Sequence, residues 1–245
     1  MNFYPIFWRE MLAWKHDFSK ILVSSLISPL LYLVTFGWGL GRRMPMEGIN
    51  YLDFVVPGII ALSALSSSYG AISADLNIRR TVFKTFEQYI MAPIAIRDVV
   101  LGEVLAGTLR GLFSCALIII LGYLFGAHLQ LSFFFILVLA ISCFTFSSLG
   151  VIAALANDSH RDMATFGSLF IVPMSFLAGT FFRIDALPGL VKYIIWLLPL
   201  TPTSHSLRSL ALGQGLEIWA LGGVVFWALA MFIGALVVTK IKYTD

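Results

Sequence analysis

Long runs almost free of charge constrain this chain more than any other feature of its sequence. Lipid offers no partners to backbone N–H and C=O groups, so a spanning segment must be a helix of about 20 mostly apolar residues. Only 12% of the 245 residues are charged, about half of the roughly 25% that is typical of soluble domains. The sequence therefore predicts an all-α membrane protein with six transmembrane helices. The six apolar runs are 21–41, 54–74, 99–125, 131–156, 163–182 and 218–239.

The second of these runs is rich in small residues. They are Ser63, Ser66, Ser67, Ser68 and Gly70. Small side chains let helix backbones approach closely in lipid. We therefore expect this run to pack against other helices.

The segments at 1–20 and 187–212 differ from the six runs. In 1–20 large apolar residues share one helical stripe, which predicts an amphipathic helix in the membrane interface, although its role could be purely anchoring. Residues 21–245 then form a single transmembrane domain. Prolines at 188, 199 and 202 interrupt the segment 187–212, and proline ends a helix because it removes a donor and clashes with the preceding turn. We expect two short outer helices here, forming a hairpin that either re-enters the membrane or lies on its surface.

A polar amphipathic stretch separates the second and third runs. Apolar residues recur there at helical spacing from Ile78 to Ile90, basic and amide residues fill the other face, and Pro93 ends the pattern. This predicts a short cytosolic helix over about 78–92 that docks on a partner protein. A helix that lies on the lipid surface is the open alternative.

The basic residues indicate how the six spans are oriented. An even number of spans places both termini on one side, and cytoplasmic segments carry an excess of Lys and Arg. Ten basic residues fall on the side of the termini and five on the other, which predicts cytosolic termini. The ten are Arg9, Lys15, Lys20, Arg79, Arg80, Lys84, Arg97, Arg161, Lys240 and Lys242, and the five are Arg42, Arg43, Arg183, Lys192 and Arg208.

Glu103 and Arg110 are the ionisable residues within the predicted third span. Seven residues make about 700° of rotation, so the two side chains lie on nearly the same helix face. Charge in the bilayer is expensive and marks function in many membrane proteins. Either this face lines the dimer or substrate path, or the two charges only fix the helix to its neighbours; both alternatives stay open.

Several kinds of chemistry have no support in the sequence. A phosphate-binding loop needs Gly-Lys followed by Ser or Thr, and none of the six lysines follows a glycine. The histidines lack metal-site spacing, and no Gly-x-Ser-x-Gly motif occurs. A net charge of +3 spread over short links is no argument for nucleic acid. We expect no enzyme, no metal and no cofactor on this chain, and an ion-coupled transporter or channel is the weaker alternative because acids within the spans are scarce.

Several short motifs, in this order and spacing, resemble the membrane subunits of type-2 ABC exporters, and the nodulation-factor exporter permeases in particular. The resemblance covers almost the whole chain. Its strongest part is Pro-Met-x-Phe-Leu-x-Gly-x-x-Phe at 173–182, followed by Leu187-Pro188. The other parts are Ala13–Lys15, Pro57-Gly58, Glu87 with Pro93, Leu101–Glu103, Leu198–Leu200, Arg208 and Leu212-Gly213. Arg183 stands where many relatives carry Pro.

The resemblance implies a permease of the cell inner membrane that forms a homodimer, with each copy contacting a separate ATPase subunit that binds ATP and Mg. Its substrates would be amphipathic, such as glycolipids, lipid-linked saccharides or hydrophobic drugs. It places the ATPase contacts at Thr85, Phe86, Glu87, Gln88, Tyr89 and Met91, with Asp158 and Arg161 as a second contact. It places the short outer helices at 187–212. The residues that we assign to these outer helices and their flank are Phe182, Pro188, Pro199, His205 and Arg208.

Overall fold

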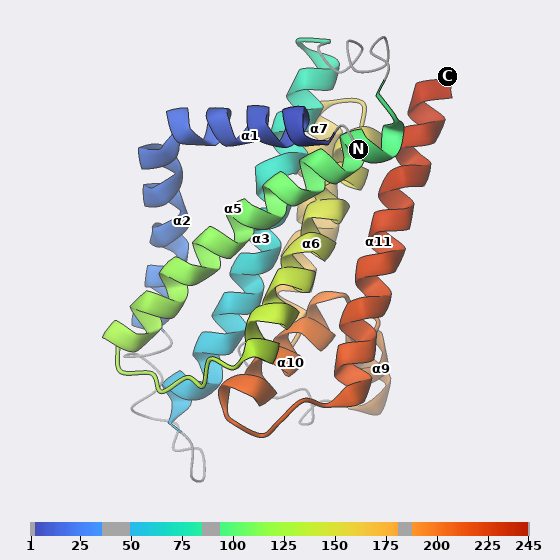
Figure 1. Ribbon diagram of the computed structural model, residues 1–245. Coiled ribbons are helices and arrows are strands. Elements are labelled where there is room, and N and C mark those ends of the chain that lie inside the picture. The colour runs from blue at the N-terminus through green and yellow to red at the C-terminus, as the bar shows by residue number, and fades with distance from the viewer. Residues whose placement is uncertain (1–2, 36–49, 85–93, 181–187, 245) are drawn as a thin grey trace.

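The computed structural model describes residues 3–35, 50–84, 94–180 and 188–244, and within these residues all regular structure is helical (Figure 1). Four of the helices are long and apolar enough to cross a membrane. The expectation of an all-α membrane protein is therefore confirmed for the part of the chain that the structure describes. The four are α3 (Tyr51–Thr81), α5 (Ile96–Leu124), α6 (Phe133–Ala156) and α11 (Ile218–Thr244).

The first and fifth predicted spans correspond to shorter helices. α1 (Tyr4–His16) meets the segment Ile21–Thr35, which contains most of α2 (Phe18–Tyr32), at 84°, and the pair makes one further candidate span. The run 163–182 is divided among α7 (His160–Phe166), the π-helical η2 (Gly167–Ile171) and α8 (Val172–Leu177). The described residues thus hold four or five candidate spans, and the six-span topology stays a prediction.

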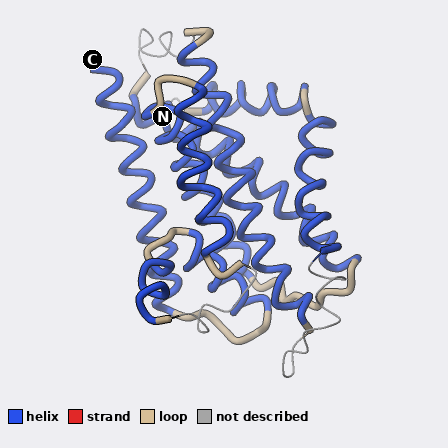
Figure 2. The backbone as a smooth tube through the Cα atoms, turned by 180° about the vertical axis from the view of Figure 1, so that it is seen from behind, coloured by secondary structure: helices blue, strands red, loops and turns tan. Residues whose placement is uncertain are grey.

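α3 and α6 form the centre of the bundle. α3 contacts α5, α6 and α10 (Leu200–Ala211), whereas α11 packs mainly on α6. The long helices run between the same two ends of the molecule when it is seen from behind (Figure 2). Both chain termini lie at the end crossed by α1, which we call the α1 end; α9 (Gly189–Trp196) and α10 lie at the opposite end, the α10 end (Figure 1).

Glycines of α5 and α6 allow the close approach of α3. A Cβ atom added to Gly150 would lie 2.9 Å from the Tyr69 carbonyl oxygen, and one added to Gly111 would overlap the Ser68 hydroxyl. Buried apolar side chains of α3, α5 and α6 fill the space around these contacts. Packing of this kind provides the dispersion energy that holds helices together in lipid.

The small residues of α3 divide between two faces of the helix. Ser63 and Ser68 are buried, which agrees with the expected close packing, but Ser66 and Gly70 are exposed and Ser67 is only half buried. A Cβ atom added to Gly70 meets nothing within 4 Å. The expectation of helix packing is therefore met at Ser63 and Ser68 and stays a prediction for this second face, which no described helix of the single chain covers closely.

The end of α3 differs from the predicted coupling helix. α3 continues without interruption to Thr81, so residues 78–81 extend this helix instead of beginning a new one. Lys84, whose φ of +51° is left-handed, follows the end of the helix. Residues 82–84 are not helical, and the remaining residues of the predicted coupling helix, 85–92, lie outside the described residues.

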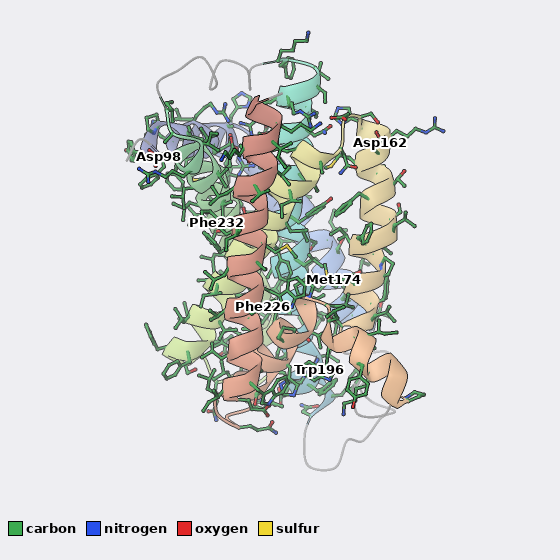
Figure 3. All side chains as sticks on the ribbon, turned by 90° about the vertical axis from the view of Figure 1, so that its right-hand side faces the viewer. Asp98, Asp162, Met174, Trp196, Phe226 and Phe232 are labelled. Atoms are coloured by element: carbon green, nitrogen blue, oxygen red, sulfur yellow. The ribbon has the colours of Figure 1, made fainter. Side chains whose placement is uncertain are left out.

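Two short helices occur within 187–212. Pro188 precedes α9 and Pro199 precedes α10, so each proline stands where a helix begins. α10 is largely buried and contacts α3, α6 and α11. α9 carries exposed apolar residues, and its last residue, Trp196, lies at the α10 end below α8 (Figure 3).

Candidate functional site

Six charged side chains meet where α1 lies against α5 and the C-terminal part of α3. This α1-end charge cluster consists of Arg9, Glu10, Asp75, Arg79, Glu103 and Arg110. Three guanidinium groups face three carboxyl groups, so the formal charges of the cluster balance when all three acids are ionised. The cluster therefore joins three elements that are far apart in the sequence.

Glu10 and Arg79 lie at the centre of this cluster. The Glu10 carboxylate lies 2.7 Å from Nη1 of Arg79 and 3.2 Å from Nη2 of Arg110. Arg79 in turn lies 3.2 Å from Oε1 of Glu103. Glu103 and Arg110, which the sequence placed on one face of the third span, are thus connected through Glu10 of α1 and Arg79 of α3.

Burial makes the centre of this cluster, around Glu10 and Glu103, sensitive to the loss of a partner. The side chains of Glu10 and Glu103 are only 1% and 2% exposed. Removing one partner of a buried ion pair leaves an uncompensated charge and costs roughly 3–5 kcal/mol. The sequence alone did not reveal Glu10, because an acid in a predicted interfacial helix has an obvious solvent-facing position.

The environment of Glu10 favours its protonated form. Burial raises the pKa of Glu10, and the neighbouring Glu103 carboxylate raises it further, to about 8, while Arg9 and Arg110 oppose the shift. α1 lies across the bundle end and is not one of the long spanning helices (Figure 1).

A second polar contact joins the ends of α3, α6 and α11. Arg80 and Lys242 both pair with the Asp158 carboxylate, and the Lys242 distance is 2.9 Å. Arg80 also donates to the Leu155 carbonyl at 2.7 Å, and Asn77 donates to the Asn157 carbonyl at 2.8 Å. These contacts attach the 157–159 link to the base of the predicted coupling segment.

The two residues predicted as a second ATPase contact have different surroundings. The Asp158 carboxylate is bound within the chain, because it accepts hydrogen bonds from Lys242 and Arg80. These hydrogen bonds lower the pKa of Asp158. Arg161 is exposed on α7. Ser159 begins α7 by accepting a hydrogen bond from the Asp162 amide at 3.1 Å, a common N-cap arrangement.

The other predicted coupling residues, Thr85 to Met91, lie outside the described residues. The structure does describe the residues that precede them, at the end of α3. Val82 and Phe83 are 61% and 66% exposed beside the end of α3. An exposed apolar pair next to basic residues is suited to contact another protein.

Arg208 is held at the α10 end by backbone carbonyls. Its Nε donates to Phe54 at 3.0 Å, and its Nη2 donates to Gly179 at 2.9 Å and to Thr180 at 3.1 Å. The guanidinium also lies 3.9 Å from the centre of the Phe54 ring. Gly58 is required here, because a Cβ atom would overlap the Thr180 carbonyl.

Of the other residues predicted for the outer side, Pro188 and Pro199 precede α9 and α10, and His205 lies on α10. His205 lies 5.0 Å from Trp219 and 5.6 Å from Trp196 between ring centres, and Glu217 is 3.6 Å from its Nδ1. Phe182 lies outside the described residues. Trp is enriched at membrane–water interfaces, so this cluster is suited to the edge of the bilayer.

The described residues form a bundle of long apolar helices with largely buried ion pairs at one end, which is the architecture of a polytopic membrane protein. The chain belongs to the ABC-2 type transporter family, whose family profile matches residues 1–212. This confirms the resemblance found in the sequence.

Relatives with known names extend this match over most of the chain. Nodulation protein J of Rhizobium meliloti (strain 1021) is 30% identical over 90% of this chain and 87% of its own length. Nodulation protein J of Rhizobium leguminosarum bv. viciae is 30% identical over 87% and 83%. Inner membrane transport permease YadH of Escherichia coli (strain K12) is 27% identical over 71% and 70%. The chain is therefore an ABC transporter permease, a family that works with a partner ATPase subunit.

Proposed function

We propose that this chain is the transmembrane subunit of an ATP-driven exporter in the cell inner membrane. Two copies would form the transport unit, and two copies of a separate ATPase would bind ATP and Mg. The α1 end would face the cytosol, together with both termini. The substrate would be amphipathic, such as a glycolipid, a lipid-linked saccharide or a hydrophobic drug, and would move outward.

One observation carries this proposal: a buried ionic cluster joins α1, α3 and α5 immediately before the segment expected to contact the ATPase. Arg79 belongs to the cluster and Arg80 to the neighbouring contact with Asp158. Force applied at residues 85–91 would therefore reach three helices at once. Such a link needs packed elements with two discrete arrangements.

α3 is the element suited to transmit this motion. It is continuous over 31 residues, a length of about 46 Å at 1.5 Å per residue. Its inner end carries Arg79, and its outer end carries Phe54, whose carbonyl binds Arg208. Closure of the ATPase subunits would move both ends of α3 together and open the interface between two copies outward.

The experiment is purification of the chain with the ATPase encoded beside it, followed by ATPase and transport assays in vesicles. We expect a stable complex whose ATP hydrolysis responds to substrate. Arg161→Glu, on exposed α7, should weaken the complex, whereas Lys192→Glu at the α10 end should not. A chain that moves substrate without any ATPase or nucleotide would contradict the proposal.

An ion-coupled transporter is the second candidate, and the buried Glu10 and Glu103 carboxylates favour it. A buried acid with a raised pKa can take up and release a proton near neutral pH. Flux driven by a pH gradient in nucleotide-free vesicles, and lost in Glu10→Gln, would support this alternative. We expect no such flux, because every carboxylate of the cluster faces a guanidinium group.

A further inference from the structure

The fifth apolar segment is one helical run with a π-helical turn in its middle. α7, η2 and α8 follow each other directly from His160 to Leu177. At the end of η2 the Val172 amide donates to the Gly167 carbonyl, five residues back instead of four. Pro173 favours this arrangement, because it has no N–H group to offer the Leu169 carbonyl. π-helical turns are frequent at functional sites, and helices bend at them.

The outer arm of this segment, α8 with the residues 178–180 that follow it, is held by α10. Ser204 and Arg208 stand four residues apart on α10 and therefore share a face. The Ser204 hydroxyl donates to the Ala178 carbonyl at 2.8 Å, and Arg208 donates to the next two carbonyls, at 179 and 180. A helix end leaves carbonyl groups without internal partners. Two side chains of α10 therefore cap the end of the outer arm.

Arg208 also connects this cap to α3. Its Nε donates to the Phe54 carbonyl near the start of α3. In the outer arm itself Met174, Ala178 and Thr180 are buried. The outer arm is thus fixed to both α3 and α10 through one guanidinium group.

The inner arm, α7, is held less firmly. It begins beside Asp162 at the α1 end, whereas Met174 of the outer arm lies nearer the middle of the molecule (Figure 3). None of the residues of α7 and η2, all of which the structure describes, is buried in the single chain. Met163 and Phe166 are partly buried contacts with the core, and a Cβ atom added to Gly167 meets nothing within 4 Å. The segment therefore combines a loosely held arm, a π-helical turn and a fixed arm.

A load applied to the inner arm can tilt the whole segment or bend it. Tilting would break the contacts of the cap, whereas rotation about η2 leaves them intact. We propose that η2 is the hinge of the fifth segment and that Arg208 is the positioning residue that keeps the outer arm in place while α7 moves. The use of this hinge in transport rests on the proposed function, in which Asp158 and Arg161 contact the ATPase.

The test measures the two arms separately, by electron paramagnetic resonance of spin-label pairs in the full chain in lipid nanodiscs. The inner pair joins Thr165→Cys on α7 to Val237→Cys on α11. The outer pair joins Phe176→Cys on α8 to Phe226→Cys on α11, and all four positions are exposed. The two native cysteines are buried and stay unlabelled, and dilution with unlabelled chain restricts the measurement to distances within one copy. Without ATPase, the distance distribution of the inner pair should be roughly twice as wide as that of the outer pair.

Two variants of α10 test the role of Arg208. Arg208→Leu removes the cap, so the distribution of the outer pair should broaden roughly twofold, to the width of the inner pair. Leu207→Ala is the matched control, because Leu207 is the fully buried neighbour and its truncation lowers stability without removing a carbonyl contact. The outer pair should stay narrow in this control, although its Tm falls.

Two matched glycine variants test the hinge. Gly167 lies in η2 and Gly222 on α11, and a Cβ atom added at either position meets nothing within 4 Å. Alanine restricts the backbone more than glycine does. Gly167→Ala should therefore narrow the distribution of the inner pair, while Gly222→Ala should leave it unchanged.

Equal widths for the two arms in the unmodified chain would overturn the hinge. Equal broadening of the outer pair by Arg208→Leu and Leu207→Ala would show that Arg208 only stabilises the fold. These failures would leave the ATPase partnership intact, because no ATPase is present in these measurements.

The same pairs can then be measured in the complex with the ATPase. ATP with vanadate should shift the inner pair and leave the outer pair in place, whereas a shift of both pairs together would identify a rigid movement and overturn the proposal. A chain that forms no ATPase complex would contradict the proposed function and leave the two arm widths standing.

Discussion

The two ends of the bundle hold buried arginines in different ways. At the α1 end, Arg79 and Arg110 face carboxylates from α1 and α5. At the α10 end, Arg208 faces three backbone carbonyls and an aromatic ring. Carboxylates can be neutralised and their pairs exchanged, whereas backbone carbonyls keep their partial charge. The comparison indicates a switchable contact at the α1 end and a fixed one at the α10 end.

The largest effect is expected for Arg79→Leu, which removes the more buried of the two arginines that contact both Glu10 and Glu103 and leaves the more exposed Arg9 to bridge them. The free energy of unfolding should fall by roughly 3–5 kcal/mol, measured as a lower Tm in nanodiscs. Arg79→Lys should lose less, because the positive charge is kept. A Tm equal to that of the unmodified chain would show that the cluster contributes nothing to stability.

Arg208→Leu tests the fixed end of the comparison. Three charge-assisted hydrogen bonds are lost, and the carbonyls of Phe54, Gly179 and Thr180 lose a donor. We expect a loss of about 2–3 kcal/mol that is the same at pH 5 and pH 8. A loss that changes across this range would remove the distinction between the two ends.

The pH dependence of stability should differ between Glu10→Gln and the unmodified chain. The pKa of Glu10 is raised from 4.5 to about 8, so the folded state binds the proton more tightly than the unfolded state. This contribution is complete below about pH 4.5 and is lost as the pH rises toward 8. Tm should therefore fall over this window in the unmodified chain.

In Glu10→Gln this part of the decline of Tm with pH should be absent. The plot of Tm against pH should otherwise keep its shape. The other charged groups that face Glu10 are Arg9, Asp75, Arg79, Glu103 and Arg110. They remain in the variant, so the difference between the two curves isolates Glu10. Parallel plots of Tm against pH for the two proteins would contradict the assignment of this decline to Glu10.

Asp158→Asn should have the smallest effect. Its side chain is 67% exposed, and exposed ion pairs contribute about 0–1 kcal/mol. The pKa of Asp158 is lowered, so its contribution is present above the ordinary pKa and disappears as the pH falls below it. Added salt should weaken it further, and hydrogen exchange near Lys242 should increase slightly. A loss as large as that of Arg79→Leu would show that the ionic contribution is not concentrated in the buried cluster.

Much of the fold followed from local patterns. The apolar runs at 54–74 and 218–239 lie within α3 and α11, and those at 99–125 and 131–156 match α5 and α6 to within two residues at the loop between them. The prolines at 188 and 199 stand where α9 and α10 begin. Glu103 and Arg110 were recognised as unusual because charge is rare inside a span. Their partners Arg79 and Glu10 were not, because ion pairs between residues 24 and 100 positions apart leave no local signal.

The sequence by itself determined the membrane environment, the helical class and the family, because apolar length, proline position and motif order are properties of neighbouring residues. Only the tertiary structure decided which side chains share a site. It paired the cluster at the α1 end, bound Asp158 within the chain, and left one serine face of α3 uncovered while burying the other. These outcomes depend on how α1, α3 and α5 cross, because desolvation and charge pairing act through space and are set by that packing.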